Sequence, residues 1–198
     1  EDEEEKDALR SSGVIRAVME PLGEKIAEKL GLNHLNYHCI KIKDRFFVLS
    51  EYIENLQTAD FYLLDEFSDT SDLSLYDIWY VLEKNNIECE ELMKDIIKMY
   101  FMDIFLLNDD RKGANWAITN EPIPRLLTFD NEFFLAYNTF YTMRINSQFG
   151  RKTDDKIEDL KVFIRESSSE FVELIEQIFE IITSKELESM IKEIFNDL

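Results

Sequence analysis

A chain of 198 residues, of which 45% are hydrophobic and 13% aromatic, can form one domain with a sizeable core, and this composition excludes a disordered acidic tail. Asp and Glu outnumber Lys and Arg by 42 to 22, so the net charge of -20 repels nucleic acids and anionic membranes, and neither is an expected partner. No apolar run reaches the roughly 20 residues of a transmembrane helix, no signal-peptide pattern opens the chain, and its cysteines form no disulfide framework, so we expect a cytoplasmic protein.

The opening segment is expected to be a flexible lead. Residues 1–18 start with the acidic run Glu1-Asp2-Glu3-Glu4-Glu5, which remains solvated. Because the chain does not begin with Met, we expect a trimmed chain or a fragment of a longer protein. Residues 19–198 contain no internal repeat and no linker-like stretch, which predicts a single domain.

A helix and a β-hairpin follow the lead. From Met19 to Leu30 the apolar residues recur every three or four positions, which lines one face of a helix, and Gly31 supplies a C-terminal cap. Residues 37–42 and 46–53 are rich in β-branched and aromatic residues and are joined by a short polar turn. This pattern predicts a hairpin.

The next elements frame a turn-rich loop. Residues 73–82 and the longer apolar stretch 90–107 are predicted helices, and residues 108–114 form the loop. Residues 116–119 and 125–129 read as two short strands, which predicts a second hairpin directly after the loop.

The last third of the chain is predicted to be helical. Amphipathic patterns cover residues 155–166, 169–183 and 185–197. Together, the elements predict an α+β fold that is dominated by helices and contains two short β-hairpins.

Three residues in and after the loop carry the chemical signal. Asp110 and Asn115 lie five positions apart in the loop, and Asp130 follows the second strand of the hairpin. Phosphoryl transfer requires a carboxylate that orients the attacking hydroxyl and oxygen ligands that hold Mg²⁺ against the phosphates. Asn115 starts the first strand and Asp130 ends the second, so the hairpin brings both to the same edge, where they can reach one metal cluster.

A family resemblance rests on these residues. Asn108-Asp109-Asp110-Arg111, followed by Asn115, a hairpin and Asp130, resembles the catalytic segment of HipA-like Ser/Thr kinases. The resemblance extends from about Glu20 to Asp130. It implies a protein-kinase-like fold that uses ATP and Mg²⁺, with Asp110 as the catalytic base and with Asn115 and Asp130 as metal ligands.

The same resemblance assigns the upstream segment. Residues 19–53 are similar to the helix, hairpin and hinge of that family, residues 70–134 to its catalytic segment, and residues 154–198 to its helical C-terminal region. It implies that Glu51 and Tyr52 offer backbone groups to adenine and that Glu24 pairs with an ATP-binding lysine. It also implies a protein substrate and a toxin–antitoxin setting, in which a small antitoxin would be a partner.

Two other interpretations remain open. Neither a glycine-rich loop nor a strand carrying the phosphate-binding lysine can be read in the first nineteen residues, which favours a catalytically incomplete, kinase-like protein-interaction module. A small-molecule or lipid kinase is the other alternative, although the acidic surface opposes a membrane-borne substrate. His34, His38 and Cys39 lack a further ligand at metal-binding spacing, so we predict no metal site there.

Overall fold

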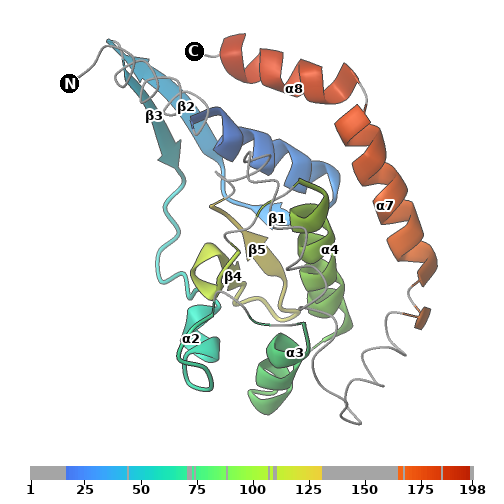
Figure 1. Ribbon diagram of the computed structural model, residues 1–198. Coiled ribbons are helices and arrows are strands. Elements are labelled where there is room, and N and C mark those ends of the chain that lie inside the picture. The colour runs from blue at the N-terminus through green and yellow to red at the C-terminus, as the bar shows by residue number, and fades with distance from the viewer. Residues whose placement is uncertain are drawn as a thin grey trace.

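The computed structural model describes residues 17–43, 45–70, 73, 75–87, 89–106, 108, 111–130, 165–166, 168–183 and 185–196. Its elements form a mixed α+β arrangement in which helices predominate (Figure 1). Asp110, Asp109 and the predicted helix over residues 155–166, except for its last two residues, lie outside the described residues.

The first helix is described from residue 17 to residue 29, and it ends as the sequence predicts. Gly31 has φ 67°, a left-handed conformation that favours glycine. The amide of Leu32 donates to the carbonyl of Ala27 over 2.9 Å, which caps the last turn.

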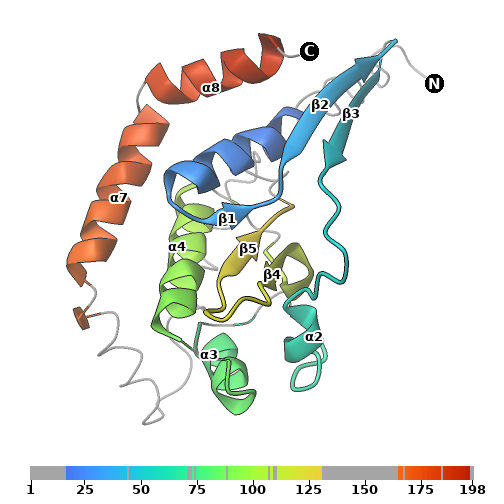
Figure 2. The same ribbon diagram turned by 180° about the vertical axis from the view of Figure 1, so that it is seen from behind.

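A two-stranded sheet stands beside the first helix. β2 (Tyr37–Ile42) and β3 (Arg45–Ser50) pair antiparallel, from Tyr37 opposite Ser50 to Ile42 opposite Arg45. Cys39 is buried on one face of this hairpin, whereas Ile42, Phe47 and Leu49 are largely exposed on the other. The hairpin, which lies beside the first helix in Figures 1 and 2, therefore has one face with exposed apolar side chains.

The second hairpin belongs to a three-stranded sheet. β4 (Trp116–Ile118) and β5 (Leu126–Thr128) pair antiparallel, and β1 (Asn33–His34) adds to β5 in parallel, in the order β1-β5-β4. The sequence analysis did not predict β1. This short strand connects the segment after the first helix to the hairpin that carries the predicted metal ligands.

Helices cover one face of this sheet. α2 (Asp60–Leu63) and α3 (Leu75–Lys84) lie in the lower part of Figure 1, and α4 (Glu90–Leu106) lies above α3, beside β5. The 3-10 turn η1 (Gly113–Asn115) leads into β4. α4 contributes many side chains of the main core, which it shares with the first helix, α3 and one face of the β4–β5 hairpin. The fully buried members from α4 are Leu92, Met93, Ile96, Ile97, Met99 and Met102.

Two aspartates of α4 anchor the β4–β5 hairpin at its two ends. Asp95 accepts hydrogen bonds from Arg125 Nε and Nη2 over 2.6 and 3.0 Å, next to the start of β5. Asp103 binds Arg111, which in turn holds the other end of the hairpin. Because both carboxylates are buried and paired, they fix the hairpin against the helix.

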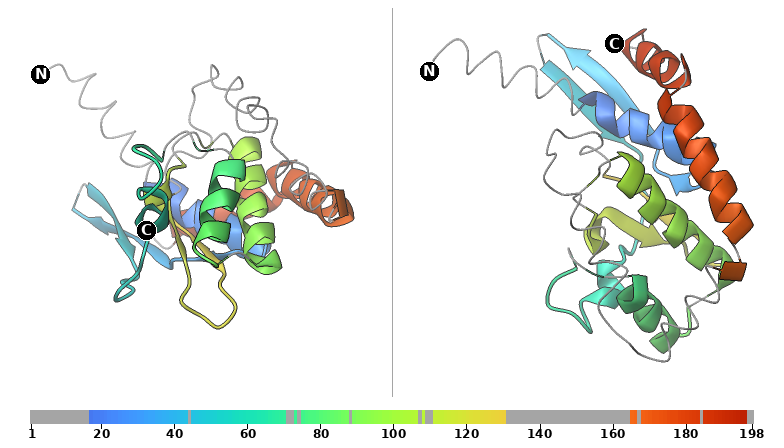
Figure 3. Two further views of the ribbon diagram at one scale, coloured as in Figure 1. Left: turned by 90° about the horizontal axis from the view of Figure 1, so that it is seen from below. Right: turned by 45° about the vertical axis from the view of Figure 1, so that its right-hand side comes forward.

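α7 (Ser168–Thr183) and α8 (Lys185–Asn196) form a C-terminal arm along the outside of the molecule (Figure 3). α7 lies along α4, where Phe171 contacts Phe101 and Glu170 pairs with Lys94. α8 lies on the first helix, where Lys25 pairs with Glu193 and Lys29 with Glu186 over 3.1 and 3.2 Å. Within the described part of the chain, no helix is both long enough and apolar enough to cross a membrane.

The arm is an integral part of the core, and this can be tested by truncating one side chain. Ile178 of α7 is 1% exposed, so Ile178→Ala should lower the free energy of unfolding by about 2–5 kcal/mol, because the smaller side chain leaves a cavity. Urea titration monitored by circular dichroism measures this change. Val172 of the same helix is 55% exposed, and Val172→Ala should change stability by less than about 0.5 kcal/mol. Equal effects of the two substitutions would contradict the packing of α7.

Candidate functional site

The site lies at the open end of the β4–β5 hairpin, opposite the turn that joins the two strands. Asn115 is buried and precedes β4, and Asp130 lies two residues beyond β5. Trp116 is opposite Thr128 in the sheet, and the amide of Phe129 donates to the carbonyl of Asn115 over 3.3 Å. The structure thus brings the Asn115 and Asp130 segments to the same end of the hairpin.

Arg111 holds this end in place. Its guanidinium donates to both carboxylate oxygens of Asp103 over 2.9 Å, and its Nη1 donates to the carbonyls of Asn115 and Phe129 over 2.8 Å. Burial lowers the pKa of Arg111, but the charge and hydrogen bonds of Asp103 more than offset this effect, and the pKa is raised above its usual value. Arg111 therefore stays charged and joins α4, the loop and both strands.

The loop backbone approaches α2 closely at Gly113. A Cβ atom at this position would lie 2.2 Å from Asp60 Oδ1, a distance that no side chain can occupy. The amide of Gly113 donates to Thr70 Oγ1 over 3.1 Å, and Thr70 Oγ1 donates to Asp60 over 2.7 Å. Glycine at position 113 thus allows the loop to pass beside α2 on its way to Asn115.

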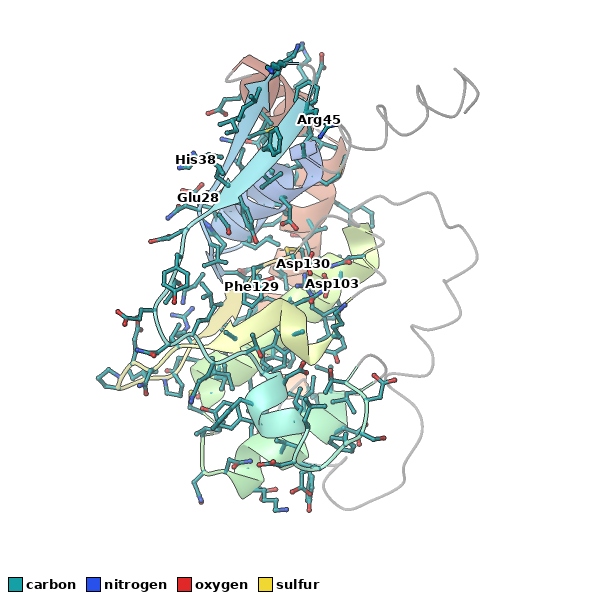
Figure 4. The ribbon with its side chains drawn as sticks, turned by 90° about the vertical axis from the view of Figure 1, so that its left-hand side faces the viewer. Glu28, His38, Arg45, Asp103, Phe129 and Asp130 are labelled. Carbon is teal, nitrogen blue, oxygen red and sulfur yellow. The ribbon has the colours of Figure 1, made fainter. Side chains whose placement is uncertain are left out.

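Asp130 has a left-handed backbone, with φ 57°. Its amide donates to the phenol oxygen of Tyr37 over 3.2 Å. Burial, and next the charge of Glu20, raise the pKa of Tyr37 well above its ordinary value, so the phenol stays protonated. Figure 4 shows Asp103, Phe129 and Asp130 close together, below the first helix and the β2–β3 hairpin that carry Glu28, His38 and Arg45.

Glu24 lies on the first helix and makes local contacts. Its Oε2 accepts a hydrogen bond from the backbone amide of Tyr37 over 2.9 Å, and its Oε1 is 3.8 Å from His34 Nδ1. The carboxylate thus anchors the start of β2 to the helix. The pairing of Glu24 with an ATP-binding lysine stays a prediction.

The predicted hinge residues follow β3. The amide of Glu51 donates to the carbonyl of Asn36 over 2.9 Å, the carboxylate of Glu51 accepts from the Asn36 side chain, and Tyr52 is exposed. Further along, the amide of Ala59 donates to the carbonyl of Trp116, which ties this connection to β4. Asp110, the predicted catalytic base, lies between Asn108 and Arg111 but outside the described residues.

The donor types at the hairpin end fit a hard divalent cation. Mg²⁺ prefers oxygen ligands, and it is commonly held by one or two carboxylates together with substrate phosphates. Asp130 offers a half-buried carboxylate and Asn115 a buried side-chain amide at this end. Among the residues that the structure describes, no group of three His, Cys, Asp or Glu side chains forms a metal site. Any metal here would therefore depend on these two residues and their neighbours in the loop.

Several residues of this site did not stand out in the sequence. Asp103 lies within the predicted helix over residues 90–107 and Tyr37 begins a predicted strand, and neither was predicted to lie at the site. A carboxylate inside a largely apolar helix is a usable signal, because a buried charge needs a partner. The partner, Arg111, lies eight residues further along the chain.

Comparisons with known proteins give one informative result. No protein-family model matches the chain, and no curated protein matches it in sequence. Among solved structures, it is similar to the crystal structure of a Helicobacter pylori proinflammatory kinase, CtkA, with a TM-score of 0.51 and 15% sequence identity. The match covers 92% of this chain and 84% of that chain. The chain therefore has a mixed α+β fold that is similar to the fold of this kinase.

The Asp103–Arg111 pair predicts a large effect on stability. Arg111→Leu removes the partner of a buried carboxylate and two hydrogen bonds to the hairpin, so unfolding should become easier by about 3–5 kcal/mol. Chemical denaturation measures this loss. The exposed pair Glu188–Lys192 on α8 is the control, and Lys192→Leu should leave the denaturation midpoint unchanged. A small effect of Arg111→Leu would show that the pair does not hold the hairpin.

Glu24 allows its two possible roles to be separated. As an anchor for the Tyr37 amide it needs only an acceptor oxygen, so Glu24→Gln should retain stability and Glu24→Ala should lose about 1–3 kcal/mol. Thermal and chemical unfolding of the three proteins test this expectation. As a partner of a lysine it needs its charge, and then Glu24→Gln would weaken nucleotide binding as strongly as Glu24→Ala.

Proposed function

We propose that this chain carries the nucleotide- and metal-binding part of an atypical, HipA-like kinase that transfers the γ-phosphoryl group of ATP to a Ser or Thr hydroxyl of a protein. The observation that carries the proposal is the open end of the β4–β5 hairpin, opposite its turn, where Arg111 holds the backbone beside Asn115 and Asp130. Phosphoryl transfer depends mainly on positioning the reacting groups and on stabilising charge. A backbone held in this way would position the residues that bind the metal.

Each residue has a proposed task. Asp110 accepts the proton of the substrate hydroxyl, whose oxygen forms a bond to the γ-phosphorus while the bond to the β–γ bridging oxygen breaks and ADP leaves. Asn115 and Asp130 hold the metal. When bound, Mg²⁺ neutralises the phosphate oxygens. Arg111 stays paired with Asp103 and keeps the two metal-binding segments together.

The proposed nucleotide site lies between the hinge and the hairpin. Glu51 and Tyr52 follow β3, and the connection from there is tied to β4 at Ala59. We propose that backbone groups at Glu51 and Tyr52 bind adenine, and that Glu24 lies near the phosphate end. The proposed setting is the cytoplasm, with a protein substrate and a small antitoxin-type partner.

A second candidate function is a protein-interaction module without catalysis. One observation favours it. The outer face of the β2–β3 hairpin exposes Ile42, Phe47 and Leu49, and contiguous exposed apolar residues often mark a binding surface. The two functions differ in whether the chain binds a nucleotide together with a metal.

Calorimetric titration distinguishes them. Mg²⁺ and a non-hydrolysable ATP analogue are titrated into the wild-type chain and into Asp130→Asn, which removes a proposed metal-binding charge. The substitution should weaken metal-dependent nucleotide binding at least tenfold, about 1.4 kcal/mol.

The matched control is Asp65→Asn, which makes the same change at an exposed position after α2. It should bind as the wild type does. Equal binding by Asp130→Asn and the wild type would remove Asp130 from the site. Binding by neither protein would favour the interaction module.

A further inference from the structure

Asp130 adopts a backbone conformation that has to be held by its surroundings. A left-handed φ of 57° is unfavourable for a residue with a Cβ atom, and such conformations persist only where neighbouring contacts determine them. The carbonyl of Phe129 accepts from Arg111 over 2.8 Å, and the amide of Phe129 donates to Asn115. The next amide, that of Asp130, donates to the phenol oxygen of Tyr37. This hydrogen bond is not part of the β4–β5 pairing, because Tyr37 belongs to β2.

Tyr37 is itself firmly held. Its amide donates to Glu24 of the first helix over 2.9 Å, and it pairs with Ser50 at the end of the β2–β3 hairpin. Its ring packs in a small apolar cluster with Leu35, Ala117, Leu127, Leu56 and Phe129. The phenol oxygen therefore has a fixed position relative to both the first helix and β5.

We propose that Tyr37 is a positioning residue for the metal-binding carboxylate of Asp130. It holds the Asp130 backbone in place relative to the first helix. The proposal rests on the proposed function, because it assigns Tyr37 a role at the same metal site. The phenol oxygen accepts a hydrogen bond from the Asp130 amide, and the Glu24 carboxylate accepts one from the Tyr37 amide. These two hydrogen bonds connect the first helix to Asp130 through Tyr37 alone.

The chemistry of the phenol suits this task. A phenol is neutral at neutral pH, so it brings no negative charge beside the Asp130 segment that it contacts. Glu20 of the first helix is 8% exposed, and its charge acts on both Tyr37 and Arg111. A neutral acceptor can orient the Asp130 backbone in this acidic surrounding without competing for a cation.

The first test concerns the protein without metal or nucleotide. Tyr37→Phe retains the ring and removes the acceptor, so the Asp130 amide should exchange its hydrogen about two- to tenfold faster, as measured by NMR. Tyr100→Phe is the control, because Tyr100 also has a buried phenol, which donates to the carbonyl of Leu73 over 2.9 Å. It should lower stability and leave the Asp130 amide unchanged.

The second test concerns the metal. In Tyr37→Phe the affinity for Mg²⁺ in the presence of a non-hydrolysable ATP analogue should fall about two- to tenfold, whereas nucleotide affinity without metal stays constant. Tyr100→Phe should bind Mg²⁺ as the wild type does.

The outcomes separate the two proposals. If the wild type binds Mg²⁺ and nucleotide and Tyr37→Phe binds them equally well, the role of Tyr37 is wrong and the proposed function stands. If Tyr37→Phe and Tyr100→Phe lose metal affinity to the same extent, the effect is general destabilisation and the proposal is again wrong. If the wild type binds no metal with the nucleotide, both proposals are overturned.

Discussion

The structure depends on the way α4 holds the β4–β5 hairpin through two buried ion pairs. Asp95 fixes the Arg125 end, and Asp103 fixes the other end through Arg111. Burying a carboxylate costs several kcal/mol unless it is paired and hydrogen-bonded, and both of these carboxylates meet that condition. Because the pairs act at opposite ends, the hairpin is attached to the helix at both of its ends. The residues proposed to bind metal therefore lie on a backbone that α4 holds in place.

Electrostatics at the site follow from the same arrangement. The chain carries a net charge of -20, and Glu20, Asp103 and Asp130 all act on the guanidinium of Arg111. Both carboxylate oxygens of Asp103 accept hydrogen bonds from Arg111, so Asp103 neutralises much of the positive charge of the guanidinium. In the proposed function, this acidic surrounding favours a divalent cation, and the cation would offer a positive surface to phosphates. An acidic protein can bind a nucleotide by this route although its overall field repels anions.

Sequence patterns predicted the elements better than their contacts. The first helix, α3, α4, α7, α8 and both hairpins follow from apolar periodicity, and their observed ends differ by only a few residues from the predicted ones. β1 escaped prediction because two residues carry no periodicity, and its parallel partner β5 lies more than ninety positions away. Asn115 and Asp130 could be singled out because an Asp–Asn loop followed by a hairpin is a local pattern, and their role as metal ligands stays a prediction. Tyr37 could not be singled out, because only folding brings its phenol to Asp130.

The C-terminal arm has a consequence for the order in which the chain folds. Lys29 and Glu186, which pair between the first helix and α8, are separated by 157 positions. During synthesis, the side of the first helix that α8 later covers stays exposed until nearly all of this sequence has left the ribosome. Contacts of such long range are formed late and slow the folding of a domain. The first helix therefore completes its ion pairs with Glu186 and Glu193 only after α8 has been synthesised, so the docking of α8 is a late step in folding.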